Sequence, residues 1–133
     1  MAKPYYLVLD DAKRNLSKRP YQTNDCVVRT LAILTDTPYD LVYSTLARSG
    51  RKPCQGCDIA AWLRRRAGLA FNHRFVQIKI RKVMPDDFAG LYPKGKFLLE
   101  SHDHCWAFCD SRHYDLIRVH DPIVRVWEVK KGY

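Results

Sequence analysis

Hydrophobic residues recur at helical spacing in the first half of the chain. After Cys26, the apolar residues stand at positions 27, 28, 31, 32 and 34, which is the spacing of the buried face of a helix. A second pattern covers about residues 38–48, with Pro38 at the first helical position. A third follows Asp58, a residue type that caps helix N-termini. The sequence therefore predicts three helices before residue 70.

From residue 71 onward the apolar segments become shorter and richer in β-forming residues. Strands are predicted at 96–100, 104–109, 114–120 and 124–129, with an early strand at 5–9 and one helical turn near 85–88. Three helices followed by such strands indicate an α+β fold. We expect N-terminal helices, with Cys26 on the first core helix, packed on a C-terminal antiparallel β-meander.

The length of 133 residues and the hydrophobic content of 47% suit one domain over residues 1–133. The sequence has no apolar run of membrane-spanning length, and its N-terminus lacks the apolar core of a secretory signal. These features predict a soluble, cytoplasmic protein that does not associate with membranes. The five cysteines are an odd number scattered along the chain, which favours reduced thiols over a disulfide framework.

The formal net charge of +9 predicts attraction to polyanions, which include nucleic acid and acidic protein surfaces. The densest basic cluster is Arg64-Arg65-Arg66, at the predicted C-terminal end of the third helix, where cations suit the helix dipole. No recognised nucleic-acid motif accompanies the charge. A basic binding protein is therefore kept as an alternative function.

Cys26 is the residue with the most informative chemical context. It follows Asn24 and Asp25, both N-cap residue types, so it is predicted in the first turn of a helix. The positive end of the helix dipole stabilises a thiolate there, and the thiolate is the reactive form of cysteine. The alternative is that Cys26 is one more small core residue.

A cysteine nucleophile needs a histidine base and a third group that orients the histidine. His104 begins a predicted strand, and Asp121 ends the next one. If the two strands form a hairpin around a turn at Arg112-His113, paired positions sum to 225, which places His104 opposite Asp121. Directly opposed side chains are close enough for a carboxylate to bond an imidazole. Arg-His is not a favoured hairpin turn, however, and a different loop would shift this register.

The order of these residues resembles the papain-like cysteine peptidase superfamily, in particular the bacteriocin-leader peptidase domains fused to ABC exporters. Small phage-encoded members are similar in their Asn-Asp-Cys helix start and in a His-x-x-Ala strand like residues 104–107. The resemblance covers roughly residues 20–130, and its specificity lies in the order of short motifs. It implies a papain-like fold and a phage or bacterial origin, with the host cytoplasm as the location of a phage-encoded protein.

The resemblance implies that Cys26 is the nucleophile, His104 the general base and Asp121 the orienting residue. Gln22 would help the Cys26 backbone N–H to stabilise the oxyanion. Gln22 lies only four residues before the cysteine, which is closer than the usual family spacing, so Asn24 is an alternative oxyanion donor. Val27 stands where the family often has a small residue. These departures leave peptidase and other acyl chemistry open.

A zinc site is the competing interpretation of the cysteines. Cys54 and Cys57 have metal-ligand spacing, and further ligands could come from the histidines and cysteines between residues 102 and 109. A single Cys-x-x-Cys motif is a weak signal, and no matching second motif follows. We therefore expect no metal and no cofactor, with a zinc-stabilised interaction module as an alternative.

The sequence predicts a thiol hydrolase of peptidase type that acts on a peptide, isopeptide or other acyl substrate. Its expected partner is a protein or peptide substrate, with association of polyanions through the basic surface as a further expectation.

Overall fold

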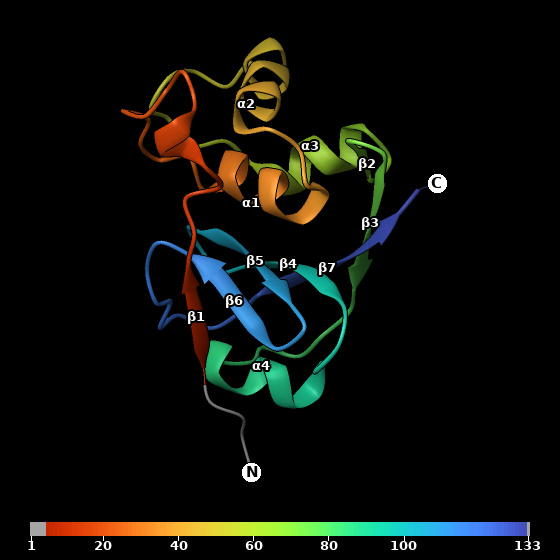
Figure 1. Ribbon diagram of the computed structural model, residues 1–133. Helices are drawn as coiled ribbons and strands as arrows, with labels where there is room; N and C mark the ends of the chain where they lie inside the picture. The colour runs from red at the N-terminus through yellow and green to blue at the C-terminus, as the bar shows by residue number, and fades with distance from the viewer. Residues whose placement is uncertain (1–4, 133) are drawn as a thin grey trace.

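The computed structural model describes residues 5–132 as a seven-stranded mixed sheet with helices on both faces (Figure 1). Three helices cover one face, and a fourth lies on the other. The elements in chain order are β1 (Tyr6–Leu9), a 3-10 turn (Arg14–Leu16), α1 (Cys26–Thr35), α2 (Tyr39–Arg48), α3 (Ile59–Arg65), β2 (Leu69–Ala70), β3 (His73–Ile78), α4 (Pro85–Leu91), β4 (Lys96–Glu100), β5 (Cys105–Cys109), β6 (Arg112–Asp115) and β7 (Arg125–Lys131).

The three predicted N-terminal helices are confirmed, because their signals are local. α1 begins at Cys26, α2 follows Pro38, and α3 is capped by Asp58, whose Oδ1 accepts from the Ala61 N–H at 3.0 Å. α1 and α2 have ten residues each. Within residues 5–132, the helices are too short or too polar for any of them to span a membrane.

The predicted meander is only partly correct. β4, β5 and β6 pair antiparallel in succession, but β7 returns to the other side of β4 and lies between β4 and β3. The order across the sheet is β1-β6-β5-β4-β7-β3-β2. β1 pairs parallel with β6, so the sheet is mixed. The α+β class holds, and the connections are less local than a meander.

The turn between β5 and β6 lies two residues earlier than the sequence predicted. Asp110 and Ser111 form it with φ angles of +46° and +70°, and Phe108 pairs with His113, so paired positions sum to 221. A two-residue turn with both φ angles positive matches the twist of a hairpin, and aspartate tolerates that conformation. The predicted turn at residues 112–113 is therefore wrong. The strand predicted at 114–120 is present as β6, but it begins two residues earlier and ends at Asp115.

Alternate side chains of β4 enter two separate cores. Leu98 packs with α1, α2 and α3, whereas Phe97 and Leu99 pack with Phe88 of α4. Both faces of the central strands are thus buried, which explains their nearly continuous apolar sequences. α4 has seven residues, about two turns rather than the single turn predicted from the sequence, and its Phe88 and Ala89 cover the second face.

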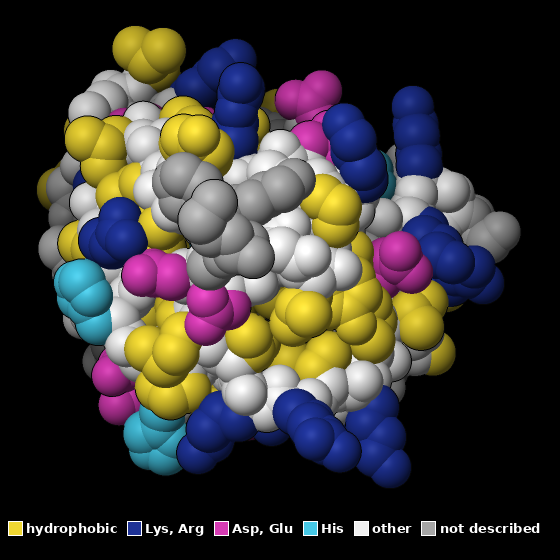
Figure 2. Space-filling view, turned by 90° about the horizontal axis from the view of Figure 1, so that it is seen from below, with side chains coloured by type: hydrophobic (Ala, Val, Ile, Leu, Met, Phe, Trp, Pro, Cys, Tyr) yellow, Lys and Arg dark blue, Asp and Glu magenta, His cyan; other side chains and the backbone are white. Residues whose placement is uncertain are grey.

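Figure 2 views the molecule from the end on which α4 lies in Figure 1. Hydrophobic side chains gather on this face, and Lys and Arg side chains lie around its edge. Among the described residues, the visible basic side chains on this face therefore form no continuous stripe of the kind that tracks a nucleic-acid backbone.

The loop that leads into α1 is held by the buried carboxylate of Asp25. Its Oδ1 accepts from Arg29 Nε at 3.0 Å and from Arg14 Nη1 at 3.1 Å, and its Oδ2 accepts from the Tyr39 hydroxyl at 2.6 Å. Hydrogen bonds and charges of these partners outweigh burial and keep the Asp25 pKa below its ordinary value. Asp25 is the N-cap residue, as predicted, but its side chain binds α1 and α2 rather than capping the helix.

We expect Tyr39→Phe to lower the free energy of unfolding by about 1.5–3 kcal/mol at neutral pH, because a hydrogen bond to a charged group is lost. The matched control is Tyr43→Phe, which keeps the ring that stacks with Arg19 at 4.1 Å. It should cost about 0.5 kcal/mol or less. Urea unfolding of both variants measures the difference, and equal losses would contradict the role of the Tyr39 hydroxyl.

Candidate active site

Cys26 lies at the entrance of α1 and is half-buried. Its side chain lines a cavity of about 380 Å³ between the start of α1, the segment before α3 and the mouth of β5. The cavity is lined by Cys26, Val27, Cys57, Asp58, Ile59, Glu100, Ser101, His102, Asp103, His104, Cys105, Val124 and Arg125. Because the first N–H groups of a helix have no intrahelical partner, the N-terminus of α1 favours negative charge on this cysteine.

His104 stands immediately before β5 and lines the same cavity. Its Nε2 is 2.6 Å from Oδ2 of Asp115, the last residue of β6, whose side chain is fully buried. This contact occupies Nε2 and leaves Nδ1 as the ring nitrogen that can exchange a proton with Cys26. The ring also stacks on Trp106, at 5.9 Å between ring centroids. The structure thus brings together a thiol, an imidazole and a carboxylate.

The predicted partner of His104 was Asp121, and this prediction is wrong. Asp121 is exposed in the segment between β6 and β7, whereas His104 bonds to Asp115. The cause is the register of β5 against β6. If the observed pairing, which ends at Ala107 and Tyr114, is extended by one residue, Asp115 lies opposite Trp106. Asp115 is then the diagonal neighbour of His104. The signal for this register was present, since Asp110-Ser111 is a better turn sequence than Arg112-His113.

The cysteine and the histidine stabilise each other as an ion pair. The hydrogen bond from the Cys105 thiol, followed by hydrogen bonding and charge from His104, outweighs burial and lowers the Cys26 pKa to about 4. Burial disfavours the charged His104 ring, but hydrogen bonds with Asp115 and Cys26 raise its pKa to about 9. Between these values the site holds a thiolate beside an imidazolium.

Arg29 connects this site to the buried Asp25. Its Nη1 donates to Asp115 Oδ1 at 3.0 Å, and its Nε donates to Asp25 Oδ1 at 3.0 Å. The Leu116 N–H also donates to Asp115 Oδ1, at 2.7 Å. The Oδ1 atom of Asp115 is therefore held by Arg29 of α1 and by the N–H of the next residue, Leu116. The Oδ2 atom is left to contact His104. No sequence signal marks Asp115 or Arg29 as site residues, because their contact depends on how α1 docks on the sheet.

Gln22 and Asn24 both contact Cys54. Gln22 is buried, and its Oε1 accepts from the Cys54 N–H at 3.0 Å and from Arg51 at 3.4 Å. The exposed Asn24 donates from Nδ2 to the Cys54 carbonyl at 3.1 Å. Among the described residues, neither of the two lines the cavity beside Cys26. An oxyanion role for either side chain stays a prediction, and the N-terminus of α1 is the donor that the geometry favours.

Cys54 and Cys57 are both free thiols in the loop before α3. Burial is the main cause that raises the pKa of Cys57, which lines the Cys26 cavity. No group of three or more His, Cys, Asp or Glu side chains in the described part of the chain could hold a metal ion. The alternative zinc site therefore gains no support from geometry.

The arginine cluster lies at the end of α3, as predicted. Arg64 and Arg65 are exposed, and Arg66 lies 4.6 Å from the Trp62 ring and donates to Ser49 Oγ at 3.3 Å. These contacts account for Arg66 as part of the helix end rather than as a dedicated ligand site.

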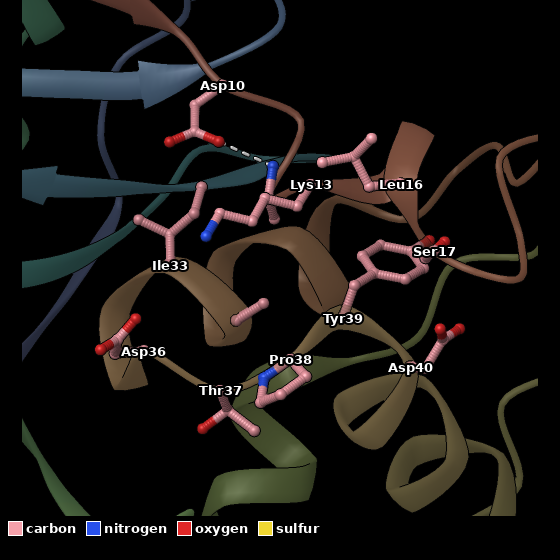
Figure 3. Close-up of a pocket in the computed structure, with 12 residues that line it drawn as sticks. Asp10, Lys13, Leu16, Ser17, Ile33, Asp36, Thr37, Pro38, Tyr39 and Asp40 are labelled. Carbon is pink, nitrogen blue, oxygen red and sulfur yellow. Dashed lines mark hydrogen bonds between the residues drawn. The ribbon is translucent and has the colours of Figure 1, made fainter.

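A larger cavity, about 440 Å³, lies between the loop after β1, the C-terminal end of α1 and the start of α2 (Figure 3). The described residues around it include no cysteine or histidine. The hydroxyl of Ser17 donates to the Arg14 carbonyl, and that of Thr37 is bonded to Thr35. The size of this cavity therefore does not make it the reactive site.

Comparison of the chain with protein-family models, curated proteins and solved structures finds no match. The chemistry of the Cys26 cavity is therefore inferred from its own geometry.

We expect Cys26 to be alkylated by iodoacetamide with a midpoint near pH 4, because the rate follows the thiolate fraction. An unperturbed cysteine would show a midpoint near ~8.5. Alkylation rates between acidic and alkaline pH, followed by peptide mapping, separate Cys26 from the other four thiols. A Cys26 midpoint in the alkaline range would contradict the ion pair.

The His104 pKa tests the identity of the orienting carboxylate. Asp115→Asn should lower the NMR titration midpoint of His104 by about one to three pH units, because the stabilising charge is removed. Asp121→Asn is the matched control and should leave the midpoint unchanged. A response to Asp121→Asn rather than to Asp115→Asn would restore the register predicted from the sequence.

Proposed function

We propose that the protein is a papain-like thiol hydrolase that acts on a peptide, isopeptide or other acyl substrate. Cys26 is the nucleophile, His104 the acid and base, and Asp115 the orienting residue. The observation that carries the proposal is the 2.6 Å contact between His104 Nε2 and the buried Asp115 carboxylate, at the mouth of the cavity that contains Cys26. It fixes the histidine tautomer that a thiol nucleophile requires.

In the acylation step, the Cys26 thiolate attacks the substrate carbonyl carbon. Negative charge develops on the carbonyl oxygen, where the N–H groups at the start of α1 stabilise it. The His104 imidazolium then gives its Nδ1 proton to the leaving amine as the carbon–nitrogen bond breaks. The products of this step are a Cys26 thioester and a free amine.

In the deacylation step, neutral His104 takes a proton from water, and the resulting hydroxide attacks the thioester. The carbon–sulfur bond breaks, the acid leaves, and the thiolate–imidazolium pair returns. Asp115 accepts a hydrogen bond from Arg29 while its other oxygen contacts His104 Nε2. Its role is to orient the ring and to stabilise the imidazolium.

The placement of the residues supports the papain-like interpretation over other thiol chemistry. The proposed nucleophile begins a helix that packs on the sheet, and the histidine immediately precedes a central strand of that sheet. The cavity beside them is bordered by exposed His102 and Asp103, so an extended substrate can reach Cys26 from the surface.

Activity is tested with p-nitrophenyl acetate, an acyl donor that needs no specificity pocket. We expect a burst of p-nitrophenol and an acetyl group on Cys26 by peptide mapping. Cys26→Ser should abolish the burst, and His104→Ala should slow it by about 10²-fold or more. Cys109→Ser is the control, because Cys109 is a half-buried thiol whose pKa is raised by burial, and it should leave the burst unchanged. An acetyl group on another cysteine would contradict the assignment.

A further inference from the structure

A second thiol lies directly against the proposed nucleophile. The Sγ of Cys105 is 3.7 Å from the Sγ of Cys26, and the Cys105 thiol donates a hydrogen bond to it. Cys105 is the first residue of β5, follows His104 and is 3% exposed. Its sulfur is also 3.6 Å from the Thr30 hydroxyl of α1. The pairing of α1 with β5 therefore holds two sulfur atoms in contact.

The two thiols are chemically different. Cys26 faces the cavity and carries the negative charge, whereas Cys105 is enclosed, and its pKa is raised by the adjacent Cys26 and by burial. An accessible thiolate is the form that peroxides oxidise, and a neighbouring thiol is the group that resolves the product. In the acyl chemistry proposed above, Cys105 acts only as a hydrogen-bond donor to Cys26. That chemistry does not use the ability of the Cys105 thiol to form a disulfide.

We propose that Cys26 reacts with hydroperoxides and that Cys105 then resolves the product as a Cys26–Cys105 disulfide. This redox site requires a reactive Cys26 but no acyl substrate. The ligand class is a small hydroperoxide that fits the cavity beside Cys26.

In the first step, the Cys26 thiolate attacks one peroxide oxygen, and the oxygen–oxygen bond breaks. The departing alkoxide takes a proton from the His104 imidazolium and leaves as an alcohol, or as water from hydrogen peroxide. Cys26 is now a sulfenic acid. In the second step, the Cys105 sulfur attacks the Cys26 sulfur, and the sulfur–oxygen bond breaks. The hydroxide leaves with the Cys105 proton as water. Two thiols have been oxidised, and one peroxide has been reduced.

The second step requires little movement. A disulfide has a sulfur–sulfur bond of about 2.05 Å, so atoms that are 3.7 Å apart must approach by roughly 1.6 Å. Rotation of the Cys26 side chain, at the first position of the helix, supplies movement of this size. Cys57 lines the same cavity and is the competing resolving thiol.

The disulfide would have two consequences for the site. It removes the nucleophile while oxidant is present, and a thiol reductant restores it. It also protects Cys26 from further oxidation to the sulfinic acid, which is not reversed by thiols.

The test uses the full chain and hydrogen peroxide at one equivalent. Remaining thiols are blocked with N-ethylmaleimide, and peptides are mapped by mass spectrometry. We expect three of the five thiols to be labelled, with the peptides of Cys26 and Cys105 cross-linked. Dithiothreitol should return all five. A Cys26–Cys57 cross-link, or a Cys26 that stays reduced, would overturn the proposal.

Two variants add controls. In Cys105→Ala, Cys26 should be trapped by dimedone as the sulfenic acid and should proceed to the sulfinic acid. In Cys57→Ser, the Cys26–Cys105 cross-link should form as in the unmodified protein. If Cys105→Ala does not fold, the cross-link map of the unmodified chain still decides the question. Equal sulfinic acid in the unmodified protein and in Cys105→Ala would refute the role of Cys105.

Discussion

The Arg29 guanidinium lies between two buried carboxylates, Asp25 before α1 and Asp115 at the end of β6. Each carboxylate would be costly to bury alone, and breaking such a buried pair costs about 3–5 kcal/mol. Satisfying both requires α1 to dock on the sheet in one position. That position sets Cys26 beside His104, because the same carboxylate that accepts from Arg29 also orients the histidine. The geometry of the site thus follows from the ion pair between Arg29 of α1 and Asp115 of β6.

The thiolate of Cys26 is stabilised by more than the N-terminus of α1. Cys26 receives a hydrogen bond from the Cys105 thiol in addition to the charge of His104. A strongly lowered pKa keeps the thiolate present across the physiological range, but it also reduces the intrinsic nucleophilicity of the sulfur. The arrangement therefore keeps Cys26 ionised over a wide pH range, at the expense of the reactivity of each thiolate. Such a sulfur is also a good leaving group from a thioester, which suits the deacylation step of the proposed reaction.

The sequence was most informative about features that depend on residues close together along the chain. Cys26 and Asp58 mark helix starts that the structure confirms, because capping and apolar spacing are local signals. The hairpin register failed, because it depends on which two residues tolerate positive φ, and a shift of the turn exchanges Asp121 for Asp115. The contacts of Gln22 and Asn24 with Cys54 could not be read from spacing, since they require the loop before α3 to fold back over the loop before α1. The order of residues along the chain was enough to place Cys26 at a helix start and His104 beside a strand. Their partners depend on long-range packing, which the order does not reveal.

The parallel pairing of β1 with β6 has a consequence for how the site is assembled. Leu9 pairs with Asp115, and the Asp10 N–H donates to the Asp115 carbonyl at 3.1 Å, so a strand near the start of the chain borders the one that carries the orienting carboxylate. About a hundred residues separate the two, and closing a loop of that length carries a large entropic cost before any contact is gained. On a ribosome, β1 emerges long before β6 and has no sheet to join. Cys26 and its helix can therefore be made and partly folded before His104 and Asp115 have been synthesised, and the candidate site is completed only when β5 and β6 join the sheet.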